Sequence, residues 1–252
     1  MNKEQIRSIN PGEVIGFQDS VNQLTRESWP EFMWHNSVIK EHWDDLFDRF
    51  PEYQAILLDT KTNQPIAVGH SLPFVWEAEL NRLPDNGWDW VVKKAVQDHK
   101  EGRTPTAQVA IIVAIHTEYQ RQGLSSKVLQ AVRSIGESKG FTNLVVPVRP
   151  NLKRLYPLIN MDDYIQWTND EGMPFDAWLR VHVRLGGKII KVCPQAKTVL
   201  GTRAEWEEWT GLKFPQSGEY IVPGALSPME LDIEKDEGIY IEPNVWMQHS
   251  LA

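Results

Sequence analysis

The chain has 252 residues, a net charge of −8, and hydrophobic and charged fractions of 41% and 24%. These values are ordinary for a globular protein, so they exclude a disordered chain and allow one domain with insertions. The acidic charge argues against a nucleic-acid or anionic-membrane surface, because both need a cationic footprint.

The single cysteine, Cys193, excludes an intramolecular disulfide and a multi-cysteine zinc site. The first residues, 1–6, contain no apolar signal segment, and no run reaches the roughly 18 apolar residues of a membrane span. We therefore expect a cytoplasmic protein with no metal, no nucleic-acid partner and no membrane partner.

Hydrophobic periodicity predicts helices and strands along the whole chain. In chain order, the expected elements are helices within 17–49 interrupted at Pro30, strands 53–58 and 66–72 joined by a polar turn, helix 88–99, strand 108–116, helix 124–139, strand 144–148, a partly helical segment 151–164, helix 177–185, strand 188–192, helix 203–209, and strands 220–222 and 229–233. Asp176 and Thr202 are expected N-caps, and Gly140 is an expected C-terminal cap.

The segment 108–148 has the clearest pattern, an apolar strand followed by a loop, an amphipathic helix and a second apolar strand. Its loop reads Gln120-Arg121-Gln122-Gly123-Leu124-Ser125. Backbone N–H groups in such a turn converge at a helix N-terminus, which suits a phosphate or pyrophosphate group. Gly123 allows close approach of the backbone. An ordinary turn is the alternative interpretation.

Residues 113–125 resemble the coenzyme A-binding motif of the GNAT superfamily of N-acetyltransferases. In that family a hydrophobic strand, an acidic residue and an aromatic residue precede the pattern Q/R-x-x-G-x-G/A. Gln120 and Gly123 match this pattern, whereas Ser125 replaces its last glycine or alanine. The nucleotide loops G-x-x-x-x-G-K-[ST] and G-x-G-x-x-G are both absent.

The resemblance implies an α/β (α+β) fold, the acyl-CoA N-acyltransferase fold, with a mixed central sheet flanked by helices. We expect a single domain over 1–252, with a core of about 13–192. An inserted segment near 73–105 and a C-terminal extension of about 193–252 would lie outside the common core. The whole chain resembles a bacterial acetyltransferase-like subgroup of the family.

The resemblance also implies how acetyl-CoA or coenzyme A would bind. Amides of the loop would hold the pyrophosphate, two residues of the preceding strand would pair with the pantetheine arm, and an asparagine would contact the coenzyme. The implied cofactor-binding residues are Val113, Ile115, Gln120, Arg121, Gln122, Gly123, Leu124, Ser125, Ser126 and Asn151.

The family places a tyrosine beside the coenzyme sulfur, where it protonates the leaving thiolate. Two residues compete for this general-acid role. Tyr156 follows strand 144–148 and has the right chemistry, whereas His182 lies at a helix end that has the right pattern. A histidine with an ordinary pKa near 6.5 could donate this proton at neutral pH. A core tyrosine and a histidine satisfied by the backbone are the structural alternatives.

Other residues leave further choices open. Candidate general bases for the acceptor amine are His70, Glu77, Glu79 and His116. Arg149, Lys153 and Arg154 form a basic cluster that would meet the coenzyme's 3′-phosphate or face solvent. The string from Gly136 to Gly140 matches the Gly-x-Ser-x-Gly elbow of hydrolases, but it lies at the end of a helix rather than on a strand-to-helix turn.

The eleven tryptophans predict core or interface packing, with an aromatic pocket as the alternative.

These patterns together predict an acyl-CoA-dependent acyltransferase. It would transfer acetyl from acetyl-CoA to a primary amine of a small molecule or protein by direct attack. The alternatives are a longer acyl donor or a hydroxyl acceptor on the same scaffold, or a non-catalytic module that senses coenzyme A. A homodimer is a further expectation.

Overall fold

The computed structural model describes residues 6–9 and 11–251. Within these residues nine strands form one sheet in the order β1-β2-β3-β4-β5-β9-β8-β7, with β6 paired to β9. The strands are β1 (Ile6–Ser8), β2 (Gln54–Asp59), β3 (Pro65–Phe74), β4 (Ala107–Ile115), β5 (Asn143–Val148), β6 (Lys188–Gly201), β7 (Gly218–Tyr220), β8 (Met229–Asp232) and β9 (Glu237–Ser250).

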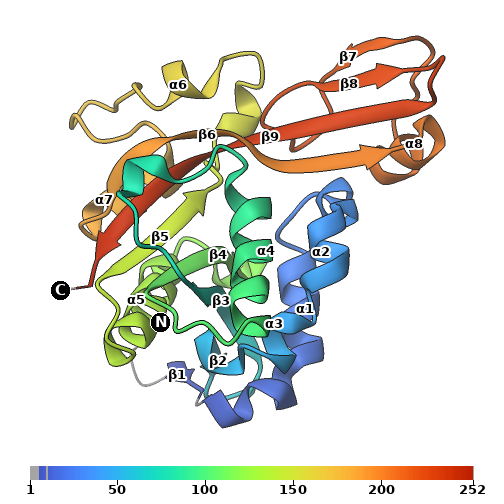
Figure 1. Cartoon of the computed structure of the whole chain (residues 1–252). Coiled ribbons are helices and arrows are strands. Elements are labelled where there is room, and N and C mark those ends of the chain that lie inside the picture. The colour runs from blue at the N-terminus through green and yellow to red at the C-terminus, as the bar shows by residue number, and fades with distance from the viewer. Residues whose placement is uncertain (1–5, 10, 252) are drawn as a thin grey trace.

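Helices cover both faces of this sheet (Figure 1). They are α1 (Gln18–Arg26), α2 (Ser37–His42), α3 (Asp45–Asp48), α4 (Gly87–Lys100), α5 (Leu124–Ser138), α6 (Met161–Tyr164), α7 (Ala177–Arg184) and α8 (Arg203–Thr210). The first four helices share one hydrophobic core with one face of the sheet, and α5 and α7 share a second core with the opposite face. The mixed α/β fold predicted from the sequence is confirmed.

Most of the expected elements form at their predicted positions. The hairpin of β2 and β3 is confirmed, and its turn is stabilised because the Asp59 side chain accepts a hydrogen bond from the Lys61 N–H at 2.7 Å. Asp176 caps α7 through two backbone N–H groups, and Thr202 begins α8 with a reciprocal capping box. Helix α4 lies in the segment between the paired strands β3 and β4, as expected for an insertion.

The prediction that residues 193–252 lie outside the core is wrong. Strand β9 pairs along its C-terminal half with β5, in a register from Asn143–Ser250 to Val148–Val245. It therefore lies inside the sheet between β5 and β6, and the expected boundary at residue 192 falls within β6. Figure 1 shows β6 and β9 as a long pair of antiparallel strands, with β7, β8 and α8 at its far end. Pro194 and Pro243 interrupt the apolar alternation of both strands, so neither reads as a long strand.

Strands β4 and β5 are parallel, and they pair only at Gln108–Leu144 and Val109–Val145. Beyond these two pairs the strands diverge. The register of β4 with β3 shifts at the same place, so Ile111 has no partner in β3 and forms a bulge. A bulge bends its strand and increases its local twist. The bulge and the divergence together open the sheet at its centre.

Helix α5 packs closely over β3. A Cβ added at Gly69 would lie 2.6 Å from Cγ2 of Val132 and 2.7 Å from Cγ1 of Val128. Glycine is required here because the helix leaves no room for a side chain. This close contact holds the start of α5 beside the opening between β4 and β5. No helix in the described part of the chain is long and apolar enough to cross a membrane.

Replacing Gly69 by alanine is expected to reduce the free energy of unfolding by roughly 1–3 kcal/mol, because the added methyl overpacks the contact between α5 and β3. Urea unfolding measures this change. Gly16→Ala is the control, since a Cβ at Gly16 meets nothing within 4 Å. A Gly69→Ala protein as stable as the Gly16→Ala protein would contradict the close packing.

Candidate functional site

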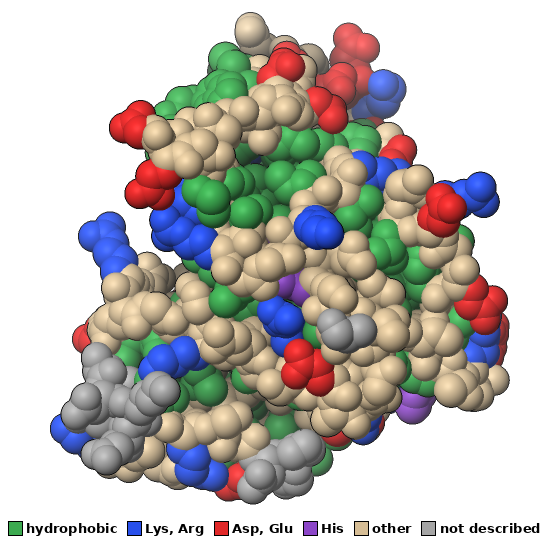
Figure 2. Space-filling model, turned by 90° about the vertical axis from the view of Figure 1, so that its left-hand side faces the viewer, with side chains coloured by type: hydrophobic (Ala, Val, Ile, Leu, Met, Phe, Trp, Pro, Cys, Tyr) green, Lys and Arg blue, Asp and Glu red, His purple; other side chains and the backbone are tan. Residues whose placement is uncertain are grey.

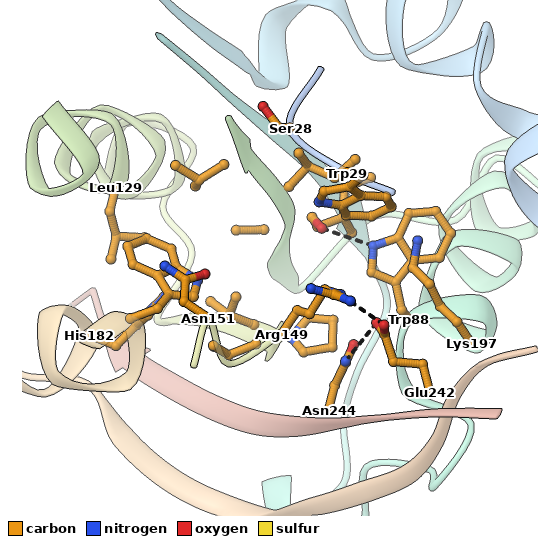
Figure 3. A pocket seen from close by; sticks show the side chains of 18 residues that line it. Ser28, Trp29, Trp88, Leu129, Arg149, Asn151, His182, Lys197, Glu242 and Asn244 are labelled. Atoms are coloured by element: carbon orange, nitrogen blue, oxygen red, sulfur yellow. Dashed lines mark hydrogen bonds and ion pairs between the residues drawn. The ribbon is translucent and has the colours of Figure 1, made fainter. Parts of the chain in front are cut away.

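A cavity of about 120 Å³ lies where β4 and β5 diverge (Figure 3). One wall is the backbone of residues 110–113 in β4, and the facing wall is 146–149 at the end of β5. Helix α7 contributes His182 at one end, and β6 contributes Lys197 at the other. The cavity therefore lies where the two central strands separate.

The backbone of β4 is turned partly toward this cavity. The His116 N–H donates to the Ile66 carbonyl of β3 at 3.0 Å. Hydrogen-bonding direction alternates along an antiparallel strand, so residues 112 and 114 also face β3. Val113 and Ile115 then direct their N–H and C=O groups to the open side. A linear amide-containing chain could pair with these groups as an added strand does.

Two side-chain hydrogen bonds confirm this direction on either side of Val113. The Trp88 indole N–H donates to the Ile111 carbonyl at 2.9 Å, and the Gln120 side-chain amide donates to the Ile115 carbonyl at 3.3 Å. Both carbonyls therefore lie on the open side of β4.

The loop before α5 has the geometry of an anion site. Arg121 and Gly123 both have left-handed backbones, with φ of 61° and 76°. Gly123 is the N-cap of the fifteen-residue α5, and among the described residues no side chain caps the first amides of the helix, at Leu124, Ser125 and Ser126. Those N–H groups and the positive end of the helix dipole can therefore receive an anion. Residues 120–123 are exposed, so a ligand can reach them.

The structure separates the two candidate general acids. His182 lines the cavity, and its Nδ1 lies 2.9 Å from Nε2 of His249, whereas its Nε2 has no hydrogen-bond partner in the described residues. Tyr156 packs instead in an aromatic cluster whose other members are Tyr164, Trp167 and Phe175. The cavity therefore contains His182 and not Tyr156.

None of the four candidate general bases lines the cavity. Glu77 and Glu79 are exposed after β3, and His116 lies at the far end of β4. His70 is fully buried, with Nδ1 2.8 Å from Gln54 Oε1. Burial lowers the pKa of His70 to about 3, so this ring is a neutral structural group.

The prediction of a basic cluster that meets the coenzyme's 3′-phosphate or faces solvent is wrong for two of its three residues. Arg149 turns inward and pairs with the buried Glu242 at 2.8 Å. Lys153 is buried and donates to the carbonyls of Leu226 and Tyr156 at 2.6 and 2.9 Å. Arg154 alone is exposed. Asn151, at the end of β5, lines the cavity as a coenzyme-contacting asparagine could.

Lys197 and two of the tryptophans form a part of the site that sequence reasoning missed. Lys197 is fully buried, with Nζ 3.2 Å from the centroid of the Trp88 ring and 3.8 Å from that of Trp29. Most tryptophans do pack in the cores, but Trp29, Trp88 and Trp178 line the cavity. A lysine within an apolar strand could have indicated this part of the site. The predicted strand ended at residue 192, however, so it did not include Lys197.

Burial changes the pKa of the ionisable groups at both ends of the cavity. It lowers the pKa of His182 well below its usual range, and it lowers that of His249 to about 4. It also lowers the pKa of Lys197, against the attraction of Asp89 and Glu242. Cys193 is buried with a pKa raised to about 12 by burial, so it is no nucleophile. Among the described residues, no group of three or more His, Cys, Asp or Glu side chains could hold a metal ion.

No family model matches the chain. A curated protein, arginine N-acetyltransferase avaD of Aspergillus versicolor, is 30% identical over 249 residues, and the match covers 88% of this chain and 85% of that protein. Because this relative is fungal, the bacterial subgroup stays a prediction.

Solved structures share the fold at low sequence identity. The loading GNATL domain of CurA from Lyngbya majuscula has a TM-score of 0.63 at 17% identity and covers 98% of this chain and 96% of its own. The GphF GNAT-like decarboxylase in complex with isobutyryl-CoA has a TM-score of 0.58 at 13% identity, with 98% and 99% covered.

The histidine pair is expected to make stability depend on pH. An unfolded histidine has a pKa near 6.5, whereas His182 and His249 have lower values when folded, so below about pH 6.5 the unfolded state binds more protons. The free energy of unfolding is therefore highest above that pH and falls toward pH 4. The decrease is at most about 1.4 kcal/mol for each pH unit and each of the two histidines. Urea unfolding at pH 7.0 and 5.5 measures this decrease. The free energy of unfolding should fall less between the two pH values in His249→Gln than in the native protein.

His116→Gln is the control for this measurement, because that ring is only half-buried and lies outside the pair. It should keep the native pH dependence. An unchanged pH dependence in His249→Gln would mean that the pair is not held neutral in the folded protein.

Proposed function

The chain belongs to the GNAT superfamily and is an acyl-CoA-dependent N-acetyltransferase, and from this premise we propose that it acetylates a primary amine by direct attack in the cavity between β4 and β5. The observation that supports this site most directly is the divergence of β4 from β5 beside an uncapped helix N-terminus. Acetyl-CoA is the co-substrate of such a reaction.

Each part of the site has a role in binding acetyl-CoA. The amides at the start of α5, with Gln120, Arg121 and Gln122 around them, would hold the pyrophosphate. The backbone of Val113 and Ile115 would pair with the pantetheine arm. A β4 N–H group on the open side, such as that of Val113, would polarise the thioester carbonyl. These groups are fixed before the substrates arrive, so the protein acts mainly by positioning.

In the reaction, the amine nitrogen bonds to the thioester carbon, and the bond from that carbon to sulfur breaks. The amine loses a proton, and the leaving thiolate gains one. We assign this transfer to Nε2 of His182, which takes the proton from the amine and then gives it to the thiolate, because its Nδ1 is already engaged by His249 and burial keeps the ring neutral between turnovers. For Nε2 to be free to accept the proton, His182 must donate its own Nδ1–H to Nε2 of His249. His249 is thus a positioning residue that selects the tautomer.

The acceptor is proposed to be a small molecule that carries a primary amine. The fungal relative is an arginine N-acetyltransferase, so L-arginine is the first acceptor to assay. Release of free thiol from acetyl-CoA on addition of an amine distinguishes a transferase from a non-catalytic coenzyme A sensor.

A homodimer and a cytoplasmic location are further proposals. On the face shown in Figure 2, hydrophobic side chains gather over the upper part of the molecule, where α6 and strands β6–β9 lie in Figure 1. Exposed apolar residues here include Leu200 of β6, Ile241 of β9 and Leu158, which precedes α6. Exposed apolar surface of this kind is compatible with a contact between two copies of the chain.

Gly123→Asp is expected to weaken acetyl-CoA binding at least about tenfold, because it places a negative charge where the pyrophosphate should lie. Isothermal titration of native and variant protein measures this. Gly140→Asp is a matched control at the other end of α5. Its φ of 77° is close to the 76° of Gly123, and neither glycine has an atom within 4 Å of an added Cβ. Equal binding by both variants would place the pyrophosphate elsewhere, and no binding to native protein would refute the proposed function.

His182→Phe is expected to lower kcat on the order of 10²-fold without weakening acetyl-CoA binding, since it removes only the proton donor. Tyr156→Phe should keep native activity, because its ring lies in an aromatic cluster away from the cavity. Thiol release under saturating acetyl-CoA measures both. If Tyr156→Phe lost activity and His182→Phe did not, Tyr156 rather than His182 would be the residue that protonates the thiolate.

A further inference from the structure

Lys197 has a buried amino group without a hydrogen-bond partner among the described residues at the wall of the cavity. Its side chain is fully buried, and in the part of the chain that the structure describes its Nζ has no hydrogen-bond partner. An ammonium group carries three N–H donors, and a buried donor without an acceptor is destabilising. The faces of Trp29 and Trp88 attract the cation, but they accept no ordinary hydrogen bond.

The carboxylate on the cavity wall, that of Glu242, already accepts three hydrogen bonds. Its Oε2 accepts from Arg149 Nε at 2.8 Å and from the Tyr240 hydroxyl at 3.0 Å, and its Oε1 accepts from Asn244 Nδ2 at 3.2 Å. Arg149 also balances its charge. Glu242 is therefore committed mainly to Arg149, and within the described residues it accepts no hydrogen bond from Lys197.

Asp89 is the second nearby carboxylate, and it too is engaged elsewhere. Both its oxygens accept from Asn36 Nδ2, at 3.0 and 3.1 Å, and Oδ2 also accepts from the Thr198 N–H at 3.0 Å. No ion pair links it to Lys197 within the described residues, and Asp89 does not line the cavity. It attracts the lysine without accepting a hydrogen bond from it. Lys197 therefore presents N–H donors that lack an acceptor among the described residues at the cavity wall.

We propose that Lys197 binds a carboxylate of the acceptor, so that the acceptors of this enzyme are amines that also carry a carboxylate, as amino acids do. This inference rests on the proposed function and specifies its substrate class. A carboxylate oxygen supplies the acceptor that the buried amino group lacks. Its negative charge also favours the ammonium form that burial alone disfavours, so the resulting bond is charge-assisted. Trp29 and Trp88 hold the lysine in one orientation and exclude water from it.

The position of Lys197 favours a carboxylate on the acceptor over one on the acyl chain. Figure 3 shows Lys197 beside Trp88, at the opposite end of the cavity from His182 and Asn151. The sulfur of the coenzyme is assigned to the His182 end. A carboxylate at Lys197 is then separated from the thioester by the width of the cavity, as the far end of an acceptor would be.

Binding of propionate and its neutral isostere propionamide to protein without coenzyme A tests this proposal. Native protein is expected to bind propionate at least about tenfold more tightly than propionamide. Lys197→Met should remove this preference, and Lys188→Met should keep it. Lys188 is a matched control because it is an exposed lysine of the same strand. Equal binding of both ligands by native protein overturns the proposal without any variant.

Two further titrations identify the source of the carboxylate. Propionate should bind native protein saturated with acetyl-CoA as well as it binds free protein, since acceptor and coenzyme occupy the cavity together. If malonyl-CoA instead binds more tightly than acetyl-CoA, and Lys197→Met abolishes that difference, the carboxylate belongs to the acyl chain and the acceptor assignment is wrong. Acetyl-CoA binding to native protein reports separately on the proposed function.

Discussion

The site depends on the fact that β4 and β5 pair through only two residues before they diverge. Backbone groups in the middle of a sheet normally find partners on both sides, and leaving them open in the interior is costly. The chain satisfies some of these groups with side chains, namely Trp88 at Ile111 and Gln120 at Ile115. Val113, between them, remains turned to the opening. The same unfinished pairing that would weaken an ordinary sheet thus leaves a place for a strand-like ligand.

The divergence also explains why β9 must lie inside the sheet. Strand β5 loses β4 as a neighbour after Val109–Val145, and β9 supports its other edge along six residue pairs. Because β9 continues past β5 along β6, it carries Glu242 and Asn244 under the cavity while its C-terminal half brings His249 to His182. One strand from the end of the chain therefore supplies residues to both ends of the site.

The sequence predicted what local patterns can reveal. The strand, loop and helix over 108–139 form at their predicted positions, because apolar periodicity, a glycine at a left-handed position and a terminating Gly140 are short-range signals. The role of β9, the inward turn of Arg149 and the burial of Lys197 were missed. Each depends on partners far along the chain, such as Glu242 for Arg149 and Trp29 and Trp88 for Lys197. Composition and spacing contain no information about such pairings.

The charges of the cavity follow from this arrangement. Arg149 and Glu242 form a closed ion pair near its middle, so together they present no net charge to a ligand. The histidine end is neutral because burial holds the pKa of His182 and His249 low, whereas the lysine end keeps a donor without an acceptor. A zwitterionic acceptor would experience this asymmetry as an orienting force, with its carboxylate drawn to Lys197. Its amine would then lie toward the open backbone of β4, where the thioester is proposed to bind. The position of one buried lysine would thereby decide which end of the acceptor reacts.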